Sequence, residues 1–170
     1  EVLFGAFLGG EVPFADLSGR IKKAKLDKDI AKSRQSLFAY KGKTYGIPQS
    51  LSAMVVYYRA DLFKELGIDP ATLTTWDKFV AAGKTVVEDH GKSMIALDPT
   101  YFGILLRQRD SDLFGRDGSV FPDREAAIEV LGWMQKQMES RVGMVPERAS
   151  IFDPLFFNSA IQYGEVLTVV

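Results

Sequence analysis

Residues 45–70, YGIPQSLSAMVVYYRADLFKELGIDP, place the strongest constraint on the fold of this chain. A Gly-Ile-Pro corner leads into an apolar run, 51–58, which predicts an extended strand. The run turns directly into a short charged helix, 60–66, because Gly67 can end a helix in the left-handed conformation and Pro70 blocks its continuation. The fold therefore has to accommodate a long extended segment between a rigid corner and the start of a new helix.

The composition is typical of a globular protein with one ordinary domain or two small lobes. The chain has 170 residues, of which 46% are apolar and 25% charged. Lys and Arg total 21 against 22 Asp and Glu, so no nucleic-acid partner is expected. The absence of cysteine excludes disulfides and thiolate metal sites. No apolar run approaches the roughly 20 residues that span a bilayer, and the first residues lack the basic start of a signal peptide.

Both ends of the sequence have the pattern of a buried strand. The chain opens on the apolar run Val2–Leu8 without an initiator Met, and it closes on GEVLTVV. A buried strand needs neighbours in its sheet. We therefore expect missing partners at both ends and a chain that is part of a larger protein.

The first fifty residues predict few regular elements. A weak helical segment at Val12–Leu17 is expected to stop at the following Ser-Gly pair. The charged stretch 20–35, RIKKAKLDKDIAKSRQ, favours a solvated loop with a short helix over a polyanion-binding surface. Gly42 lies between two short aromatic-rich runs, which predicts a tight hairpin with positive φ at this glycine.

Strands and helices alternate after residue 50, so the predicted fold class is α/β with an antiparallel hairpin admixture. The expected elements are, in chain order, a helix with a capping box at Thr74 and Asp77, a buried strand at 93–97, a helix opened by Asp98-Pro99, a hairpin at Asp117-Gly118, a long helix capped by Asp123, a helix capped near Ser150 and Asp153, and a last strand.

Catalytic motifs are scarce. The single histidine, His90, lies beside Gly91 at a predicted helix end, where capping explains it. Without cysteine or a second histidine, neither a Cys-His pair nor a Ser-His-Asp triad is expected. Asp110 and Asp112 could serve acid–base chemistry or hold a hard cation, but two such residues in a polar loop are usually solvated. We predict no metal and no cofactor.

A sugar site is the binding hypothesis that the residues themselves suggest. Aromatic rings stack on sugar rings, while hydroxyl and amide groups bind sugar hydroxyls. Tyr101 or Phe102 near Gln49, Ser50 or Ser52 would make such a site. The alternative is that these aromatic residues belong to the core.

Residues 42–86, GKTYGIPQSLSAMVVYYRADLFKELGIDPATLTTWDKFVAAGKTV, resemble the signature region of the family 1 extracellular solute-binding proteins. These are the maltose-binding-protein-like receptors of bacterial ABC importers. The resemblance rests on positions that match in one register: Gly42, Lys43, Tyr45, Gly46, Pro48, Tyr58, Asp61, Leu62, Phe63, Gly67, Pro70, Trp76 and Phe79.

The resemblance implies a periplasmic-binding-protein-like fold, in which two α/β lobes face each other across a cleft. Residues 1–50 would be part of the first lobe, 51–59 the crossing strand and 60–170 the second lobe. The crossing strand would act as a hinge, with Pro48, Leu51 and Tyr58 as its hinge residues.

The resemblance also implies ligand contacts. Gln49, Ser50 and Ser52 match positions that line the cleft in relatives, although position 52 is often acidic there. Tyr101, followed by Phe102, matches an aromatic residue that stacks on sugar in the maltose-binding relatives. The stacking tryptophan that some relatives have in the first lobe would fall near Gly5, which cannot stack.

The implied function is binding of a carbohydrate or similar small polar solute, followed by delivery to ABC importer membrane subunits. The implied location is extracytoplasmic, in the periplasm or on a lipid anchor, with membrane contact only through the importer or an anchor outside this chain. Two alternatives stay open. One is a carbohydrate-active hydrolase that uses Asp110 or Asp112, and the other is a sensor-type binding protein that is not coupled to transport.

Overall fold

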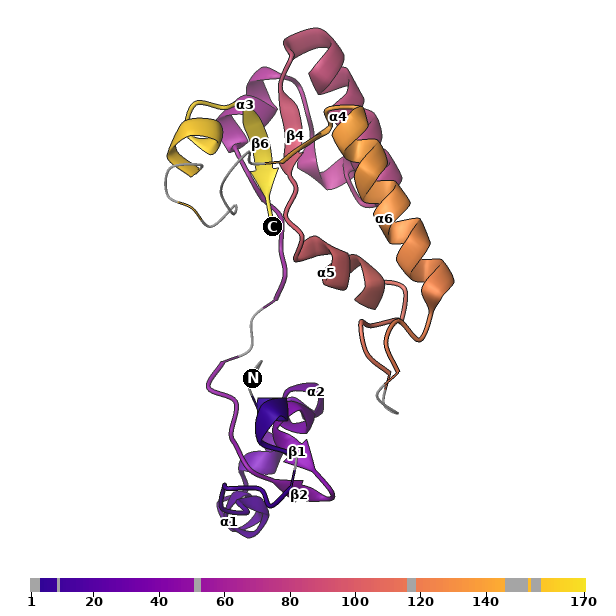
Figure 1. Cartoon of the computed structure of the whole chain (residues 1–170). Helices are drawn as coiled ribbons and strands as arrows, with labels where there is room; N and C mark the ends of the chain where they lie inside the picture. Colours follow the sequence, from indigo (N-terminus) through magenta and orange to yellow (C-terminus); the bar gives the residue numbers. More distant parts are fainter. Residues whose placement is uncertain (1–3, 9, 51–52, 116–118, 146–152, 154–156) are drawn as a thin grey trace. The chain divides into compact units, whose positions relative to one another are not determined.

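The computed structural model describes residues 4–8, 10–50, 53–115, 119–145, 153 and 157–170. The chain divides into two compact units, unit 1 at Glu1–Met54 and unit 2 at Val55–Val170. In Figure 1 unit 1 carries the indigo and violet elements, and unit 2 carries the elements from magenta to yellow.

Unit 1 consists of short elements around one hairpin. They are η1 (Phe4–Phe7), α1 (Ser18–Lys23), η2 (Leu26–Lys28), α2 (Lys32–Gln35), η3 (Ser36–Phe38), β1 (Ala39–Tyr40) and β2 (Lys43–Thr44). The predicted hairpin is confirmed, because β1 and β2 pair antiparallel around a two-residue turn. Lys41 and Gly42 both have positive φ, 48° and 75°, as a type I′ turn requires.

Two predictions for unit 1 are wrong. The described part of Val2–Leu8 forms the 3-10 helix η1 rather than a strand, and the Phe4 ring packs within 6.0 Å of Phe14 and 5.8 Å of Phe38. Aromatic packing, rather than strand pairing, accommodates this apolar run. Val12–Leu17 is not helical, because the Leu17 N–H donates to the Thr44 carbonyl of β2 at 2.8 Å. The helix α1 begins only after that contact.

Unit 2 is an α/β unit, as predicted. Its elements are β3 (Tyr57–Tyr58), α3 (Ala60–Glu65), η4 (Pro70–Thr72), α4 (Trp76–His90), β4 (Ser93–Ala96), α5 (Tyr101–Arg107), α6 (Arg124–Glu139), β5 (Gly143–Met144), the π-helix η5 (Phe157–Ile161) and β6 (Val166–Val169). The four strands form one sheet in the order β3-β6-β4-β5, with β4 parallel to both neighbours and β3 antiparallel to β6. None of the helices in the described part of the chain combines the length and the apolar composition that a membrane span requires.

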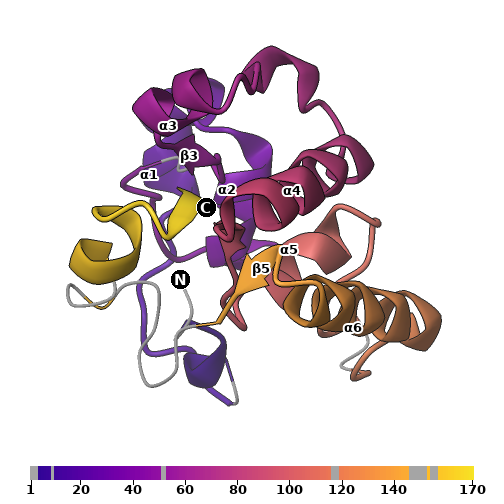
Figure 2. The same ribbon diagram turned by 90° about the horizontal axis from the view of Figure 1, so that it is seen from above.

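The core of unit 2 lies around β4, all of whose residues are buried. Figures 1 and 2 show α4 and α6 on one side of β4 and η5 on the other. The helix α4 can approach β4 closely because Gly83 has no side chain, and a Cβ there would lie 2.7 Å from Val142 Cγ1 and 2.9 Å from Met94 Cβ. The sheet is therefore covered on both faces, which fits its apolar strands.

The helices of unit 2 begin and end where the sequence predicts, except that the cap of α4 lies one residue later. Asp123 caps α6 as predicted and accepts a hydrogen bond from the Ala126 N–H at 2.9 Å. The cap of α4 is Thr75 rather than Thr74, since the Thr75 hydroxyl accepts from the Lys78 N–H at 3.3 Å. Gly67, at φ 67°, follows α3 as expected.

The strand predicted at 51–58 is much shorter in the structure. Of the described residues 53–58, only Tyr57 and Tyr58 pair, with Val169 and Thr168 of β6, whereas 53–56 are exposed and lie outside any strand. Val169 is the last residue of β6, so no further residue of that strand continues the ladder before Tyr57. Leu51 and Ser52 lie outside the described residues.

One turn and one helix cap that the sequence predicts also fall partly outside the described residues. Phe114 and Val120 form an isolated bridge at the expected hairpin, but Asp117-Gly118 is not described. Ser150 is likewise outside the described part of the chain, and the helix expected there is the short π-helix η5.

Candidate functional site

The carboxyl ends of three parallel strands meet at one edge of the sheet in unit 2. Leu97 and Asp98 follow β4, Val145 follows β5, and Val170 follows β6. In open α/β sheets, ligands bind outside the carboxyl ends of the strands. We call this part of unit 2, with the start of α5, the strand-end edge.

Asp98 and Thr100 form the polar turn of the strand-end edge. One carboxylate oxygen of Asp98 accepts hydrogen bonds from the Thr100 N–H at 2.9 Å and from the Thr100 hydroxyl at 2.7 Å. Asp98 is buried, with 6% of its surface exposed. The sequence indicated Asp98 only as a helix opener; its position directly after a buried strand was the signal for a site residue.

Tyr101 belongs to the core of unit 2 and is only 4% exposed. Its hydroxyl accepts a hydrogen bond from the Val170 N–H at 3.1 Å, which ties the start of α5 to the end of β6. Burial raises the pKa of the Tyr101 hydroxyl. Little of the ring surface is left for stacking on a sugar in this conformation, so the role implied by the resemblance stays a prediction.

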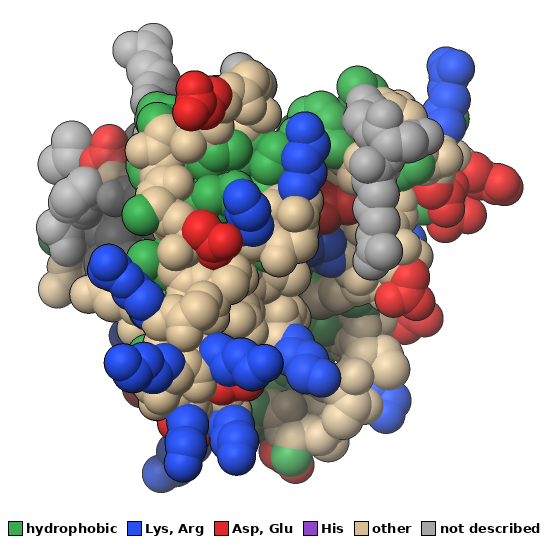
Figure 3. Space-filling view, turned by 90° about the horizontal axis from the view of Figure 1, so that it is seen from below, with side chains coloured by type: hydrophobic (Ala, Val, Ile, Leu, Met, Phe, Trp, Pro, Cys, Tyr) green, Lys and Arg blue, Asp and Glu red, His purple; other side chains and the backbone are tan. Residues whose placement is uncertain are grey.

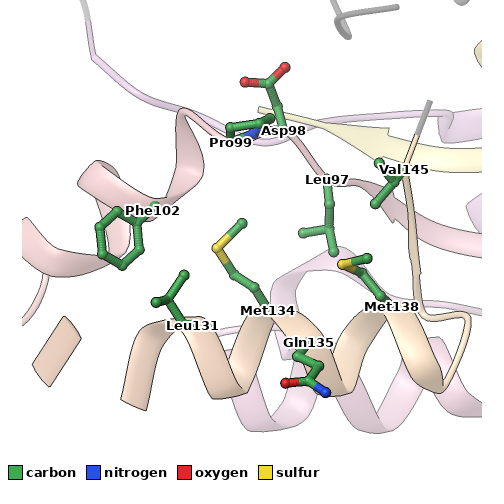
Figure 4. Close-up of a pocket in the computed structure, with 9 residues that line it drawn as sticks. All are labelled: Leu97, Asp98, Pro99, Phe102, Leu131, Met134, Gln135, Met138 and Val145. Carbon is green, nitrogen blue, oxygen red and sulfur yellow. The ribbon is translucent and has the colours of Figure 1, made fainter. Parts of the chain in front are cut away.

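Phe102 lines a groove of about 550 Å³ beside the strand-end edge. Figure 4 shows the other lining residues: Leu97, Asp98, Pro99, Leu131, Met134, Gln135, Met138 and Val145. The polar ends of Asp98 and Gln135 point away from the space that the apolar side chains surround. Since a sugar needs hydrogen-bond partners, this groove by itself suits an apolar group better than a sugar.

The site residues predicted before residue 55 belong to unit 1. Gln49 and Ser50 are exposed, and Pro48 is half-buried. The Ser50 carbonyl accepts a hydrogen bond from the Arg34 guanidinium at 3.3 Å, which fixes the backbone just after the Gly-Ile-Pro corner. Ser52 lies outside the described residues. The predicted contacts of Gln49, Ser50 and Ser52 with a ligand stay predictions.

Tyr58, predicted as a hinge residue, lies in the edge strand β3 and packs on Phe63 with ring centroids 4.7 Å apart. The next residue, Arg59, donates to the carbonyls of Ile161 and Gln162 at 2.7 and 2.8 Å and forms an ion pair with Asp61 at 2.6 Å. The start of α3 is thereby tied to the turn before β6.

The residues considered for catalysis lie just after helix α5 and at the end of helix α4. Asp112 forms an exposed ion pair with Arg107 at 3.1 Å. Partial burial works to raise the pKa of Asp112, but hydrogen bonds from the Leu113 N–H and from Arg107 outweigh it and lower the pKa. His90 is the exposed last residue of α4. Among the described residues, no three His, Asp or Glu side chains are grouped to hold a metal ion.

A comparison with protein families decides the family. The model of the bacterial extracellular solute-binding proteins matches residues 6–164. The chain belongs to this family. The resemblance seen in residues 42–86 is therefore confirmed for almost the whole length of this solute-binding-protein chain.

Relatives of this solute-binding-protein chain are sugar-binding proteins by name. An arabinooligosaccharide-binding protein of Halalkalibacterium halodurans is 36% identical over 135 residues, which make up 77% of this chain and 30% of that protein. The arabinooligosaccharide-binding protein of Bacillus subtilis is 28% identical, over 84% of this chain and 33% of that protein. A lactose-binding protein of Rhizobium radiobacter is 30% identical, over 71% of this chain and 28% of that protein. The chain spans about a third of the length of these relatives.

Solved structures confirm the fold. The GacH receptor of Streptomyces glaucescens, known unliganded and in complex with acarbose, gives a TM-score of 0.73 at 20% identity, covering 98% of this chain and 41% of that one. The galacto-N-biose-/lacto-N-biose I-binding protein of the ABC transporter from Bifidobacterium longum gives 0.69 at 24% identity, covering 92% and 39%. The solute-binding-protein chain therefore has the predicted periplasmic-binding-protein-like α/β fold.

Proposed function

We propose that this chain is part of the sugar-binding component of an ABC importer and that the strand-end edge of unit 2 forms one wall of the ligand site. The observation that carries the proposal is the family match over residues 6–164. The three named relatives bind arabinooligosaccharides or lactose, so the proposed ligand class is a short neutral oligosaccharide. Two of the three names make an arabinooligosaccharide the first ligand to test.

The polar turn of the strand-end edge supports this ligand class. A carboxylate accepts hydrogen bonds from sugar hydroxyls, and Asp98 places a carboxylate at the end of β4, where it is mostly buried and one of its oxygens accepts from Thr100. In this proposal Asp98 takes the acceptor role that relatives often give to an acidic residue at the position of Ser52. Thr100 and the edge of Tyr101 or Phe102 complete the wall, with Gln49 and Ser50 on the other lobe and Ser52 on the crossing segment.

Binding would proceed by closure of two lobes. In this proposal 1–50 is part of the first lobe, 51–59 is the crossing segment and 60–170 is the second lobe. Small φ/ψ changes near Pro48, Leu51 and Tyr58 would allow closure, and the ligand would shift the population to the closed state. That state would dock on the importer's membrane subunits, outside the cytoplasm, in the periplasm or on a lipid anchor.

Binding without catalysis fits the chemistry of the described carboxylates. A general acid needs a raised pKa near the working pH. The pKa of Asp112 is lowered instead, and its carboxylate is held by Arg107. The named relatives are binding proteins rather than enzymes.

The test is a thermal melt of the chain with and without an arabinooligosaccharide, combined with chromatography of the sugar. We expect a small rise of the melting temperature, because a ligand that binds the folded state stabilises it. Affinity should be weak, since the contacts that a second wall would add are mostly absent. The variant Asp98→Asn should lose the rise, and the loop variant Asp110→Asn should keep it. Cleavage of the sugar would overturn the proposal.

A further inference from the structure

The charges of the chain are distributed unequally between its two units. Unit 1 has nine Lys and Arg against five Asp and Glu, whereas unit 2 has twelve against 17. The two excesses cancel in the whole chain, so its overall composition hides them. A charge asymmetry between two parts of a chain indicates an anionic partner surface for the basic part.

The basic residues of unit 1 are concentrated on three consecutive helical turns. We define the basic face as Arg20, Lys22, Lys23, Lys25, Lys28 and Lys32, which lie on and between α1, η2 and α2. All six side chains are exposed. None of them forms an ion pair with another residue in the described part of the chain, although Asp27 and Asp29 lie among them. Lys and Arg side chains gather on one part of the face drawn in Figure 3.

An exposed apolar side chain lies within the basic face. Leu26, the first residue of η2, is 38% exposed; Lys25 precedes it, and Asp27 and Lys28 follow it. Binding to an acidic patch of another protein would use only the basic side chains and would give the exposed leucine no role. Lysines around an exposed leucine match a lipid surface instead, where the ammonium groups reach the phosphates and the leucine enters the boundary of the headgroups.

We infer that the basic face docks on an anionic phospholipid surface. The inference goes beyond the proposed function and differs from the expectation that this chain meets a membrane only through an importer or an anchor. Each lysine close to an anionic membrane strengthens binding by about fivefold, and the attraction falls off within roughly 10 Å. Three to six such residues give a weak, salt-sensitive contact that orients unit 1 on the membrane.

The test is sedimentation of the whole 170-residue chain with lipid vesicles. One set contains phosphatidylcholine with about 30% phosphatidylglycerol, and the other contains phosphatidylcholine alone. The variant K22E/K25E/K28E removes the centre of the basic face. The matched control, K64E/K84E/K136E, reverses three exposed lysines of unit 2. Thermal melts show whether both variants keep the fold, and K22Q/K25Q/K28Q serves as a milder second variant.

We expect binding to the anionic vesicles only, with a loss of at least tenfold on raising the salt from about 50 mM to about 500 mM. K22E/K25E/K28E should lose at least tenfold, the Gln variant less, and the unit 2 control almost nothing. The proposal is overturned by equal binding to neutral vesicles, by an equal loss in the control, or by no vesicle binding. Binding to an acidic polypeptide without vesicle binding would assign the face to a protein partner. None of these outcomes depends on sugar binding.

Discussion

The two units of the chain differ in what stabilises them. Unit 2 buries a four-stranded sheet, and Met94, Leu106 and Leu167 are fully buried there. In the described part of unit 1, Ile21 is the one buried residue, and its sheet is a hairpin of two residues a strand. An isolated two-stranded hairpin is marginally stable in water. Unit 2 therefore has a core of its own, whereas unit 1 depends on local hydrogen bonds and an aromatic cluster.

The largest expected effect on stability comes from a substitution that creates a cavity in the core of unit 2. Leu106→Ala should lower the free energy of unfolding by about 3 kcal/mol, because Leu106 is fully buried against α6. Trp76 and Trp133, the only tryptophans, both lie in unit 2, so their fluorescence follows its unfolding in urea. The matched variant Ile21→Ala should leave the fluorescence transition almost unchanged. An equal shift in both variants would show that the units unfold together.

A second test uses two glycines in helices of unit 2. Gly83→Ala should cost about 2 kcal/mol, because its Cβ would overlap Met94 and Val142. Gly132→Ala should instead stabilise the chain by roughly 0.5–1 kcal/mol, since nothing lies within 4 Å of that Cβ and alanine favours a helix. Both are read from urea unfolding by tryptophan fluorescence. A neutral effect of Gly83→Ala would mean that α4 is not packed closely on β4.

The hairpin of unit 1 offers a smaller test. Gly42→Ala should destabilise it by about 1 kcal/mol, because φ is 75° there although the space is open. Hydrogen exchange of the Tyr45 N–H, which donates to the Phe38 carbonyl at 2.9 Å, should become faster. Lys41→Asn should slow that exchange, since asparagine tolerates the φ of 48° at this position better than lysine. Slower exchange in Gly42→Ala would contradict the type I′ turn.

The smallest expected effect concerns the ion pair at the start of α3. The hydrogen bond from Arg59 lowers the pKa of Asp61 from 3.8 to about 2. A lowered pKa means that the ion pair stabilises the fold above 3.8 and that this contribution is lost as the pH falls towards 2. Asp61→Asn should therefore unfold at slightly less urea than the parent at neutral pH, and the two should converge towards pH 2. A difference that grows on acidification would contradict this assignment.

The elements that the sequence predicts well depend on local signals. The Gly42 turn, the Asp123 cap and the buried strand β4 each follow from residues within a few positions of one another. The predictions that were wrong or that gave too long a strand needed distant information. The apolar runs Val2–Leu8 and 51–58 have the composition of strands, but a strand forms only where a partner pairs with it.

In the candidate site, too, the sequence predicts what depends on local residues and misses what depends on distant ones. The sequence pointed to Tyr101 and Phe102 through their residue types and through the family resemblance, and the structure places that region at the strand-end edge. The sequence alone could not show that Tyr101 is buried or that its hydroxyl accepts a hydrogen bond from Val170, which is 69 residues away. Asp98 was recognised only as a helix opener, because its place at the sheet edge follows from the order of the strands.

The most direct test of the central claim is an NMR titration of the chain with an arabinooligosaccharide. If the strand-end edge is one wall of a sugar site, the backbone amides of Asp98 and of Thr100, Tyr101 and Phe102 should shift progressively while the sugar stays intact. The amides of the basic face should not move. Shifts confined to other parts of the chain at saturating sugar, or cleavage of the sugar, would contradict the account.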